Sequence, residues 1–173
     1  LSVKWASCNV GASAPEKTGG YYAWGETEEK SNYNWSTYIH CDGTYSTCHN
    51  IGSSICGTQY DVAHVKWGGK WRMPMLDELK ELVEKCTWTW TTQNGVEGMK
   101  VTGPNGNSIF LPAVGYRDGN DVLSAGSSGY YWSGSLTEDN GGHVWTLGFR
   151  NGGSHYWYYF GRYYGFPVRP VSE

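Results

Sequence analysis

The sequence predicts an α+β fold with two helices, a small antiparallel sheet and long ordered loops. Three observations support this prediction. One segment shows the 3.6-residue apolar period of an amphipathic helix, several later segments alternate apolar and polar residues as strands do, and residues 14–54 show neither period. Because 173 residues suffice for one hydrophobic core, we expect a single domain over residues 1–173.

The segment from Ala14 to Ser54 is dense in Gly, Ser, Thr, Asn and Tyr. It contains the runs Gly19-Gly20-Tyr21-Tyr22 and Ser31-Asn32-Tyr33-Asn34-Trp35. Aromatic side chains need partners to pack against. We therefore expect ordered loops here and not a flexible linker.

The clearest helix follows Pro74. Its apolar residues share one face: Leu76, Leu79, Leu82, Val83 and Cys86. Asp77 and Glu78 lie in the first turn, where acidic side chains interact favourably with the helix dipole, and Glu81 is spaced to pair with Lys85. A shorter helix is expected from Asp61 to Val65.

Strand signals follow this helix. Residues 99–102 and 108–111 flank an Asn-Gly turn and predict a β-hairpin, and residues 118–121 predict a turn. The apolar residues Trp145, Leu147 and Phe149 alternate with Thr146, Gly148 and Arg150, so residues 143–150 are expected to form a strand with one core face and one free face. Residues 166–171 alternate as well, and their prolines favour a terminal edge strand.

The five cysteines are Cys8, Cys41, Cys48, Cys56 and Cys86. None is spaced as a CxxC pair, and the odd number leaves at least one thiol free or paired between chains. A local disulfide between Cys41 and Cys48 is the favoured arrangement. The flanking His40 and His49 suggest zinc as an alternative, which we disfavour because structural zinc usually uses tightly spaced ligand pairs.

Charge and hydropathy exclude two classes of partner. The net charge is −3, and no block of Lys or Arg is present to attract phosphate backbones. No segment approaches the roughly 18 consecutive apolar residues of a membrane-spanning helix. We expect neither nucleic-acid binding nor a membrane span.

Four segments carry a resemblance to a known family: residues 3–11 (VKWASCNVG), 20–26 (GYYAWGE), 71–74 (WRMP) and 166–171 (FPVRPV). They resemble the Fibrobacter-type major paralogous domain of Bacteroidetes surface proteins, a branch of the C-type-lectin-like fold related to formylglycine-generating enzymes. The resemblance spans nearly the whole chain. It implies a C-type-lectin-like fold with neighbouring termini. Because the chain opens at Leu1 without Met, we also expect that an export signal has been removed, and that the protein is extracellular, on a bacterial surface or phage-borne.

Some members of this group are the variable proteins of diversity-generating retroelements, in which adenines of Asn codons are rewritten. Residues 130–171 fit such a variable region. Substitution of the two adenines in an Asn codon that ends in a pyrimidine yields residues such as Tyr, His, Gly, Phe, Thr and Arg, but never Trp, so Trp157 must be invariant. The residues that fit this pattern are Thr146, Gly148, Arg150, His155, Tyr156, Tyr158, Tyr159, Phe160, Gly161 and Tyr164.

These ten residues are the predicted ligand-binding site. Tyrosine offers a large amphipathic contact area at low entropic cost, and three adjacent aromatic residues cannot all face the core of a strand. We expect the free strand face of residues 146–150 and a loop of residues 155–164 to bind a protein or glycan. Trp145, Leu147, Phe149, Trp157 and Arg162 are expected to hold the backbone. No cofactor or metal is expected, and we expect a monomer.

Other classes of function fit the sequence less well. The catalytic cysteine pair of formylglycine-generating enzymes lies near the C-terminus, but the last cysteine here is Cys86, and His143 and His155 lack an obvious nucleophile, so no enzyme is expected. The acidic residues Glu26, Glu28, Glu29, Asp118 and Asp121 do not follow a calcium-loop pattern. The motifs of calcium-dependent lectins are missing, although aromatic rings alone can stack on sugars. A fixed adhesin or carbohydrate-binding module of a bacterial surface protein is the alternative function.

Overall fold

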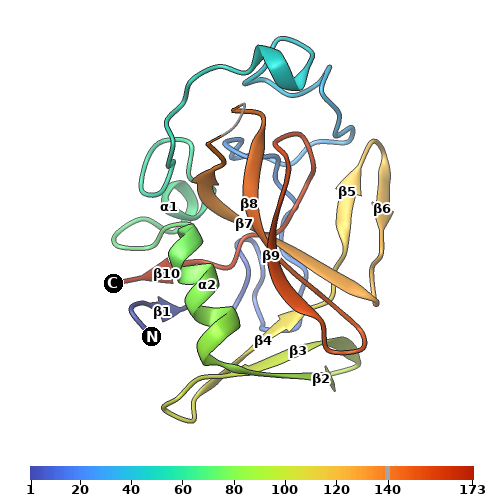
Figure 1. The fold of residues 1–173 in the computed structure, drawn as a ribbon. Helices are drawn as coiled ribbons and strands as arrows, with labels where there is room; N and C mark the ends of the chain where they lie inside the picture. The colour runs from blue at the N-terminus through green and yellow to red at the C-terminus, as the bar shows by residue number, and fades with distance from the viewer. Residues whose placement is uncertain (139–140) are drawn as a thin grey trace.

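The computed structural model describes residues 1–138 and 141–173, and its fold is mixed α+β (Figure 1). Asp139 and Asn140, which fall within the predicted variable region 130–171, lie outside the described residues. The elements are β1 (Lys4–Trp5), η1 (Tyr45–Thr47), α1 (Val62–Trp67), α2 (Leu76–Lys85), β2 (Thr87–Gln93), β3 (Val96–Thr102), β4 (Ser108–Pro112), β5 (Tyr116–Asp118), β6 (Asp121–Leu123), β7 (Ser128–Leu136), β8 (His143–Arg150), β9 (His155–Gly161) and β10 (Val171–Ser172). Among the described residues, the strands form four small antiparallel sheets: β1-β10, β2-β3-β4, β5-β6 and β7-β8-β9.

Both predicted helices are confirmed. The carboxylate of Asp61 caps α1 by accepting from the backbone N–H of His64 at 3.0 Å. In α2, the Glu78 carboxylate accepts from the Met75 N–H at 2.8 Å and pairs with Arg72 at 2.7 Å. The apolar side of α2 places Leu79 and Leu82 in the core, as its period predicts.

The predicted hairpin of β3 and β4 is also confirmed, with Thr102 opposite Ser108. The turn predicted at residues 118–121 is confirmed, with Asp118 and Asp121 paired at the ends of β5 and β6. The hairpin of β2 and β3 was not predicted, although its turn at Asn94 and Gly95 has the positive φ values, 48° and 81°, that an Asn-Gly turn favours.

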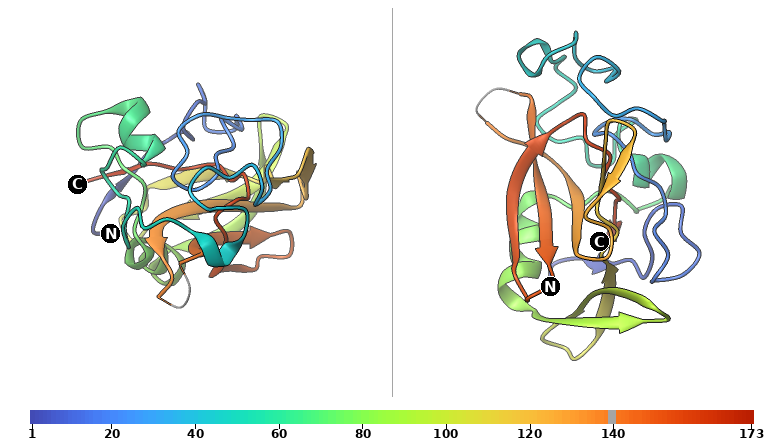
Figure 2. Two further views of the ribbon diagram at one scale, coloured as in Figure 1. Left: turned by 90° about the horizontal axis from the view of Figure 1, so that it is seen from above. Right: turned by 90° about the vertical axis from the view of Figure 1, so that its right-hand side faces the viewer.

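The strands of the sheet β7-β8-β9, orange to red in Figure 2, lie beside the green helix α2. On one face, Tyr131, Leu147 and Phe149 pack with Leu79 and Leu82 of α2 and with apolar residues of β3 and β4. On the other face, a second cluster joins the sheet to the N-terminal loops and to the C-terminal segment; its largest members are Trp24, Trp132 and Phe166. β8 is the middle strand, so it is covered from both sides.

The prediction of a terminal strand over residues 166–171 is wrong in extent. Within residues 166–173, only Val171 and Ser172 form a strand, β10. It pairs with β1, so the two ends of the chain lie together as the resemblance implies. Phe166 and Val171 make single β-bridges to Tyr22 and Arg72. Pro167 and Pro170 have no N–H to donate, which prevents a continuous ladder.

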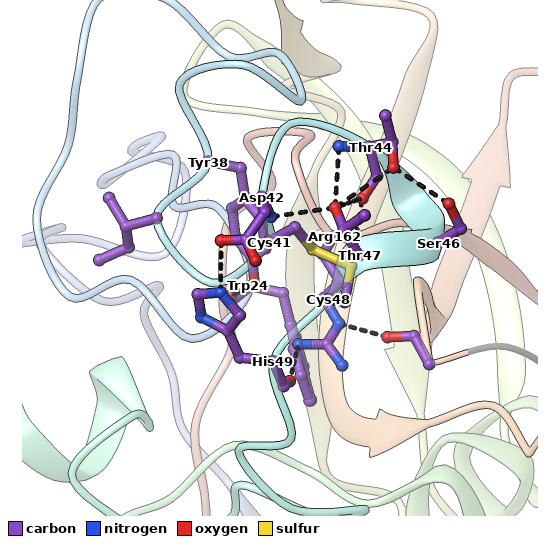
Figure 3. The surroundings of a disulfide bond; sticks show 12 residues. Trp24, Tyr38, Cys41, Asp42, Thr44, Ser46, Thr47, Cys48, His49 and Arg162 are labelled. Atoms are coloured by element: carbon purple, nitrogen blue, oxygen red, sulfur yellow. Dashed lines mark hydrogen bonds and ion pairs between the residues drawn. A yellow bond between two sulfur atoms is a disulfide. The ribbon is translucent and has the colours of Figure 1, made fainter.

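Residues 14–54 are ordered loops, as predicted, with η1 as a short helical turn. Tyr33 and Tyr38 are buried in a cluster with Cys41. Cys41 and Cys48 form the predicted disulfide, so neither sulfur is available as a thiolate ligand for zinc (Figure 3). His49 instead lies 2.8 Å from the Asp42 carboxylate.

Removal of this disulfide should destabilise the protein. A cross-link across seven residues lowers the entropy of the unfolded chain, so a Cys41→Ser/Cys48→Ser variant should lose about 2 kcal/mol of unfolding free energy. The expected drop in Tm is on the order of 5 °C, measured by circular dichroism. Cys8→Ser, which changes a free thiol, should melt like the parent. A parent Tm that does not respond to reductant would contradict the disulfide.

Alkaline pH should also destabilise the fold. Burial raises the pKa of Tyr131 to about 12, while its phenol donates to the Pro112 carbonyl at 2.8 Å. Above pH 10 or so the unfolded chain releases this proton and the folded chain retains it, so the unfolded state binds fewer protons and stability falls up to about pH 12. Tyr131 alone should account for about 2 kcal/mol of this loss. Denaturant melts along a pH series should show the decline, with a shallower slope in Tyr131→Phe; equal slopes would contradict the assignment.

Candidate functional site

The predicted free face of β8 is covered. Thr146 has an exposed fraction of 0%, and its hydroxyl donates to the Val144 carbonyl at 3.2 Å. Gly148 is buried as well, and of this face only Arg150, at the end of the strand, is exposed. Trp145, expected in the core, is only half-buried. The prediction was wrong because it assumed a half-buried strand, whereas β8 has a strand on each side and an apolar cluster on each face.

Residues 155–161, predicted as a loop, form the edge strand β9. They pair in register with β8 from His155 opposite Phe149 to Gly161 opposite His143. Aromatic residues favour strands, and the alternating direction of their side chains places neighbours on opposite faces. The prediction that these adjacent rings cannot all be buried is confirmed, since Tyr158 is 51% and Tyr159 36% exposed.

Tyr158 and Tyr159 form the most exposed part of the predicted site. Their rings stack with centroids 4.6 Å apart and planes 14° apart. Tyr159 also contacts Trp145 edge to face at 5.9 Å, and Tyr158 contacts Phe160 at 6.0 Å. We call the surface of Trp145, Tyr158, Tyr159 and Phe160 the aromatic edge. It runs from one face of the sheet to the other around the open side of β9.

Tyr156 packs against the neighbouring strand and is also partly exposed at the surface. Its ring lies over Gly148 on the neighbouring strand, where an added Cβ would come within 2.7 Å of Cε2. Gly129 and Phe149 make the same pairing on the opposite face. A ring that covers a glycine of the adjacent strand fills the gap that the missing side chain leaves. Burial and the adjacent Tyr130 raise the pKa of Tyr156 to about 12, so this phenol stays neutral.

Two further predicted residues are engaged in packing. His155 stacks on Trp88 of β2, with centroids 4.8 Å and planes 5° apart, and its Nδ1 lies 2.9 Å from the Gly153 carbonyl. Gly161 is buried, and an added Cβ would meet the Trp35 ring at 3.0 Å. A direct ligand contact is therefore expected least from Thr146, Gly148 and Gly161.

A small aromatic cavity lies beside the aromatic edge. It has a volume of about 50 Å³ and is lined by Tyr116, Tyr130, Phe160, Tyr164 and Phe166. We call these five residues the aromatic box. Phe160 and Tyr164 belong to the predicted site, while Tyr116, Tyr130 and Phe166 come from β5, β7 and the C-terminal segment. No local pattern in the sequence indicates these three residues, because only the three-dimensional fold brings them together.

No protein-family model matches this chain, and no curated protein or solved structure matches it.

Arg162 anchors the chain just after β9, as predicted. Its side chain is buried, and it donates to the carbonyls of Gly141 at 2.6 Å and His49 at 3.2 Å (Figure 3). The guanidinium also lies over the Trp24 ring, 4.9 Å from its centroid. These contacts tie the end of β9 to the disulfide loop. Trp157 is half-buried, with Lys80 of α2 at 5.8 Å from its ring centroid.

The aromatic edge and box present neutral groups. Their surfaces are phenol, phenyl and indole rings, which offer stacking, hydrogen bonds from hydroxyls, and a negative π-face to a cation. A larger hollow of about 640 Å³ lies between the terminal strands and the β3–β4 turn, and none of the ten predicted residues lines it. Within the described residues, no helix is both long and apolar enough to cross a membrane.

The pairing of Gly148 with Tyr156 can be tested by a double-mutant cycle. Gly148→Ala should cost about 1–3 kcal/mol by overpacking against the Tyr156 ring. The same change in a Tyr156→Ser background should cost under about 1 kcal/mol, because the ring is gone. Urea denaturation measures all four free energies.

Gly129→Ala is the matched control, because Gly129 faces Phe149 and not Tyr156. Its cost should be the same with and without Tyr156→Ser. Equal costs of Gly148→Ala in both backgrounds would contradict the assigned contact.

Proposed function

We propose that this protein is a recognition domain that binds its ligand through the aromatic edge and the adjoining mouth of the aromatic box. The observation that carries the proposal is the exposure of Tyr158 and Tyr159, stacked together on an edge strand. Their rings add little to core packing. Adjacent exposed aromatic rings are typical of an interaction surface.

The form of this surface suits binding. Tyrosine buries a large area on contact while only two side-chain torsions are restricted. β9 is held by its ladder to β8 on one side and by Arg162 at its end, so its rings are presented on a rigid backbone. A preorganised surface loses less entropy on binding. The proposed ligand is a protein or a glycan, and the proposed activity is binding without catalysis.

We further propose that the domain is a C-type-lectin-like variable protein of a diversity-generating retroelement, displayed on a bacterial surface or carried by a phage. Paired terminal strands, two helices and small antiparallel sheets are compatible with that fold. Arg150, Tyr158 and Tyr159 are exposed, so we expect their identities to change with little effect on the core. Variation at Thr146 and Gly148 would alter the interior, so we expect only small residues there.

A display library tests which positions are surface. Serine at Arg150, Tyr158 or Tyr159 should change the free energy of unfolding by less than about 1 kcal/mol, whereas Thr146→Tyr should cost several kcal/mol by overpacking. Folded yield and Tm report the difference.

Libraries randomised at the three exposed positions should then yield binders to purified proteins or arrayed glycans. Failure to select any binder, with folding intact, would contradict a recognition surface at the aromatic edge.

Diversification has its own test in the coding DNA. Sequencing of the flanking region should reveal a near-copy of the segment that encodes residues 130–171, differing at adenines. A fixed adhesin or carbohydrate-binding module would lack such a copy. In that case the domain would still bind through the aromatic edge, but with one ligand specificity.

A further inference from the structure

Four rings of the aromatic box form a closed circuit. Going round it, Tyr116 lies 5.2 Å from Tyr130, Tyr130 lies 5.4 Å from Phe160, Phe160 lies 6.2 Å from Tyr164, and Tyr164 lies 5.7 Å from Tyr116. Each ring stands at 76–88° to the next, so neighbouring walls are nearly perpendicular. Phe166 contacts all four rings at 5.5–5.9 Å, with its plane close to those of Tyr130 and Tyr164 and nearly perpendicular to those of Tyr116 and Phe160.

The cavity inside this circuit is too small for a whole ligand. Its volume of about 50 Å³ contrasts with the roughly 300–1,000 Å³ of pockets that enclose small molecules. It can therefore admit only the end group of a longer ligand. Sugar rings and aromatic side chains exceed it, whereas a compact tetrahedral group suits a space walled on four sides.

The chemistry of the walls favours a cation over a neutral alkyl group. Any group at the middle of a circuit with these sides lies within the distance of about 6 Å at which a cation is attracted to a ring. Several rings then act on one charge. A primary ammonium would lose its hydrogen bonds to water in such a cavity, but a methylated ammonium is weakly hydrated and loses little.

The charged side chains near the box also favour a cation. Asp118 follows Tyr116 by two residues on β5, so both side chains lie on the same face of that strand. Burial, then Tyr164 and Asp118, raise the pKa of Tyr163, and Asp118 also contributes to the raised pKa of Tyr116, so its negative charge acts on rings at the box. Arg117 points to the opposite face, with its guanidinium 5.0 Å from the centroid of Tyr33. The carboxylate is thus beside the box, and the neighbouring cation is turned away.

The geometry points to the aromatic box as a binding site for a methylated ammonium group, as borne by a choline head group or a trimethylated lysine side chain. This inference rests on the proposed function, because Phe160 belongs to both the box and the aromatic edge. It adds the chemical class of one group that the surface recognises. The aromatic edge would contact the remainder of the ligand.

The first experiment is an NMR titration of the full chain with choline and with its neutral carbon isostere, in which a tert-butyl group replaces the trimethylammonium. Choline should bind saturably at millimolar concentrations, and its N-methyl proton signal should move upfield because the methyl groups lie over ring faces. The isostere should bind at least about tenfold more weakly, since it lacks the charge. Phosphocholine and a trimethyllysine peptide then distinguish the two sources, with unmodified lysine peptide as the reference.

Variants locate the site. Tyr164→Leu keeps an apolar side chain but removes a ring, and should weaken choline binding about tenfold. Tyr45→Leu is the matched control, because it removes an exposed ring on η1 and should leave the affinity unchanged. If Tyr164→Leu does not fold, as judged by its melt, Asp118→Asn should still weaken choline binding several-fold without loss of any ring.

The outcomes separate this inference from the proposed function. Lack of choline and trimethyllysine binding, or equal binding of the neutral isostere, would overturn the box as a cation site. Selection of binders from the library at Arg150, Tyr158 and Tyr159 would in that case leave the recognition surface standing. Choline binding that is lost in Tyr164→Leu would support the box even if the library yields no binder.

Discussion

The burial of β8 on both faces is the constraint on which the rest of this structure depends. Leu147 and Phe149 pack towards α2, while Val144 and Thr146 face the cluster formed with the loops and the C-terminal segment. A strand that is covered twice has almost no surface to offer a ligand. The exposed rings lie instead on β9, which is an edge strand of this sheet among the described residues.

The same constraint explains two of the glycines of the sheet. Gly129 and Gly148 sit opposite Phe149 and Tyr156, and each ring occupies the space that a side chain on the glycine would fill. Large aromatic residues can be close-packed on both faces of a narrow sheet only if some partners are small. Some aromatic residues of β9 therefore pack against the neighbouring strand, and others are accessible to a ligand. Tyr156 covers a glycine, while Tyr158 and Tyr159 remain accessible.

Rigid support of the edge connects the fold to the proposed function. Arg162 bonds the end of β9 to the carbonyls of Gly141 and His49, and the disulfide closes the adjacent loop. Phe166, which lines the aromatic box, is fixed by its backbone bridge to Tyr22. The aromatic edge and box thus rest on elements from distant parts of the chain. Side chains at the edge can vary while the backbone beneath them is held.

Local patterns in the sequence were enough to predict the parts of the fold that depend on near neighbours. The amphipathic period after Pro74 predicted α2, the Asn-Gly turn predicted the hairpin of β3 and β4, and the spacing of Cys41 and Cys48 predicted the disulfide. Adjacent aromatic residues also predicted correctly that some rings of residues 158–160 would be exposed. Each of these features is determined by residues close together in the chain.

What only the tertiary structure decided is which faces are covered. An alternating strand has the same pattern whether its second face meets water or another layer, so the sequence could not show that Thr146 and Gly148 are buried. The aromatic box likewise requires Tyr116, Tyr130 and Phe166 to meet Phe160 and Tyr164. Their meeting depends on the packing of β5, β7, β9 and the C-terminal segment. Such long-range contacts leave no local period in the sequence, because they arise from the order of strands and layers in space.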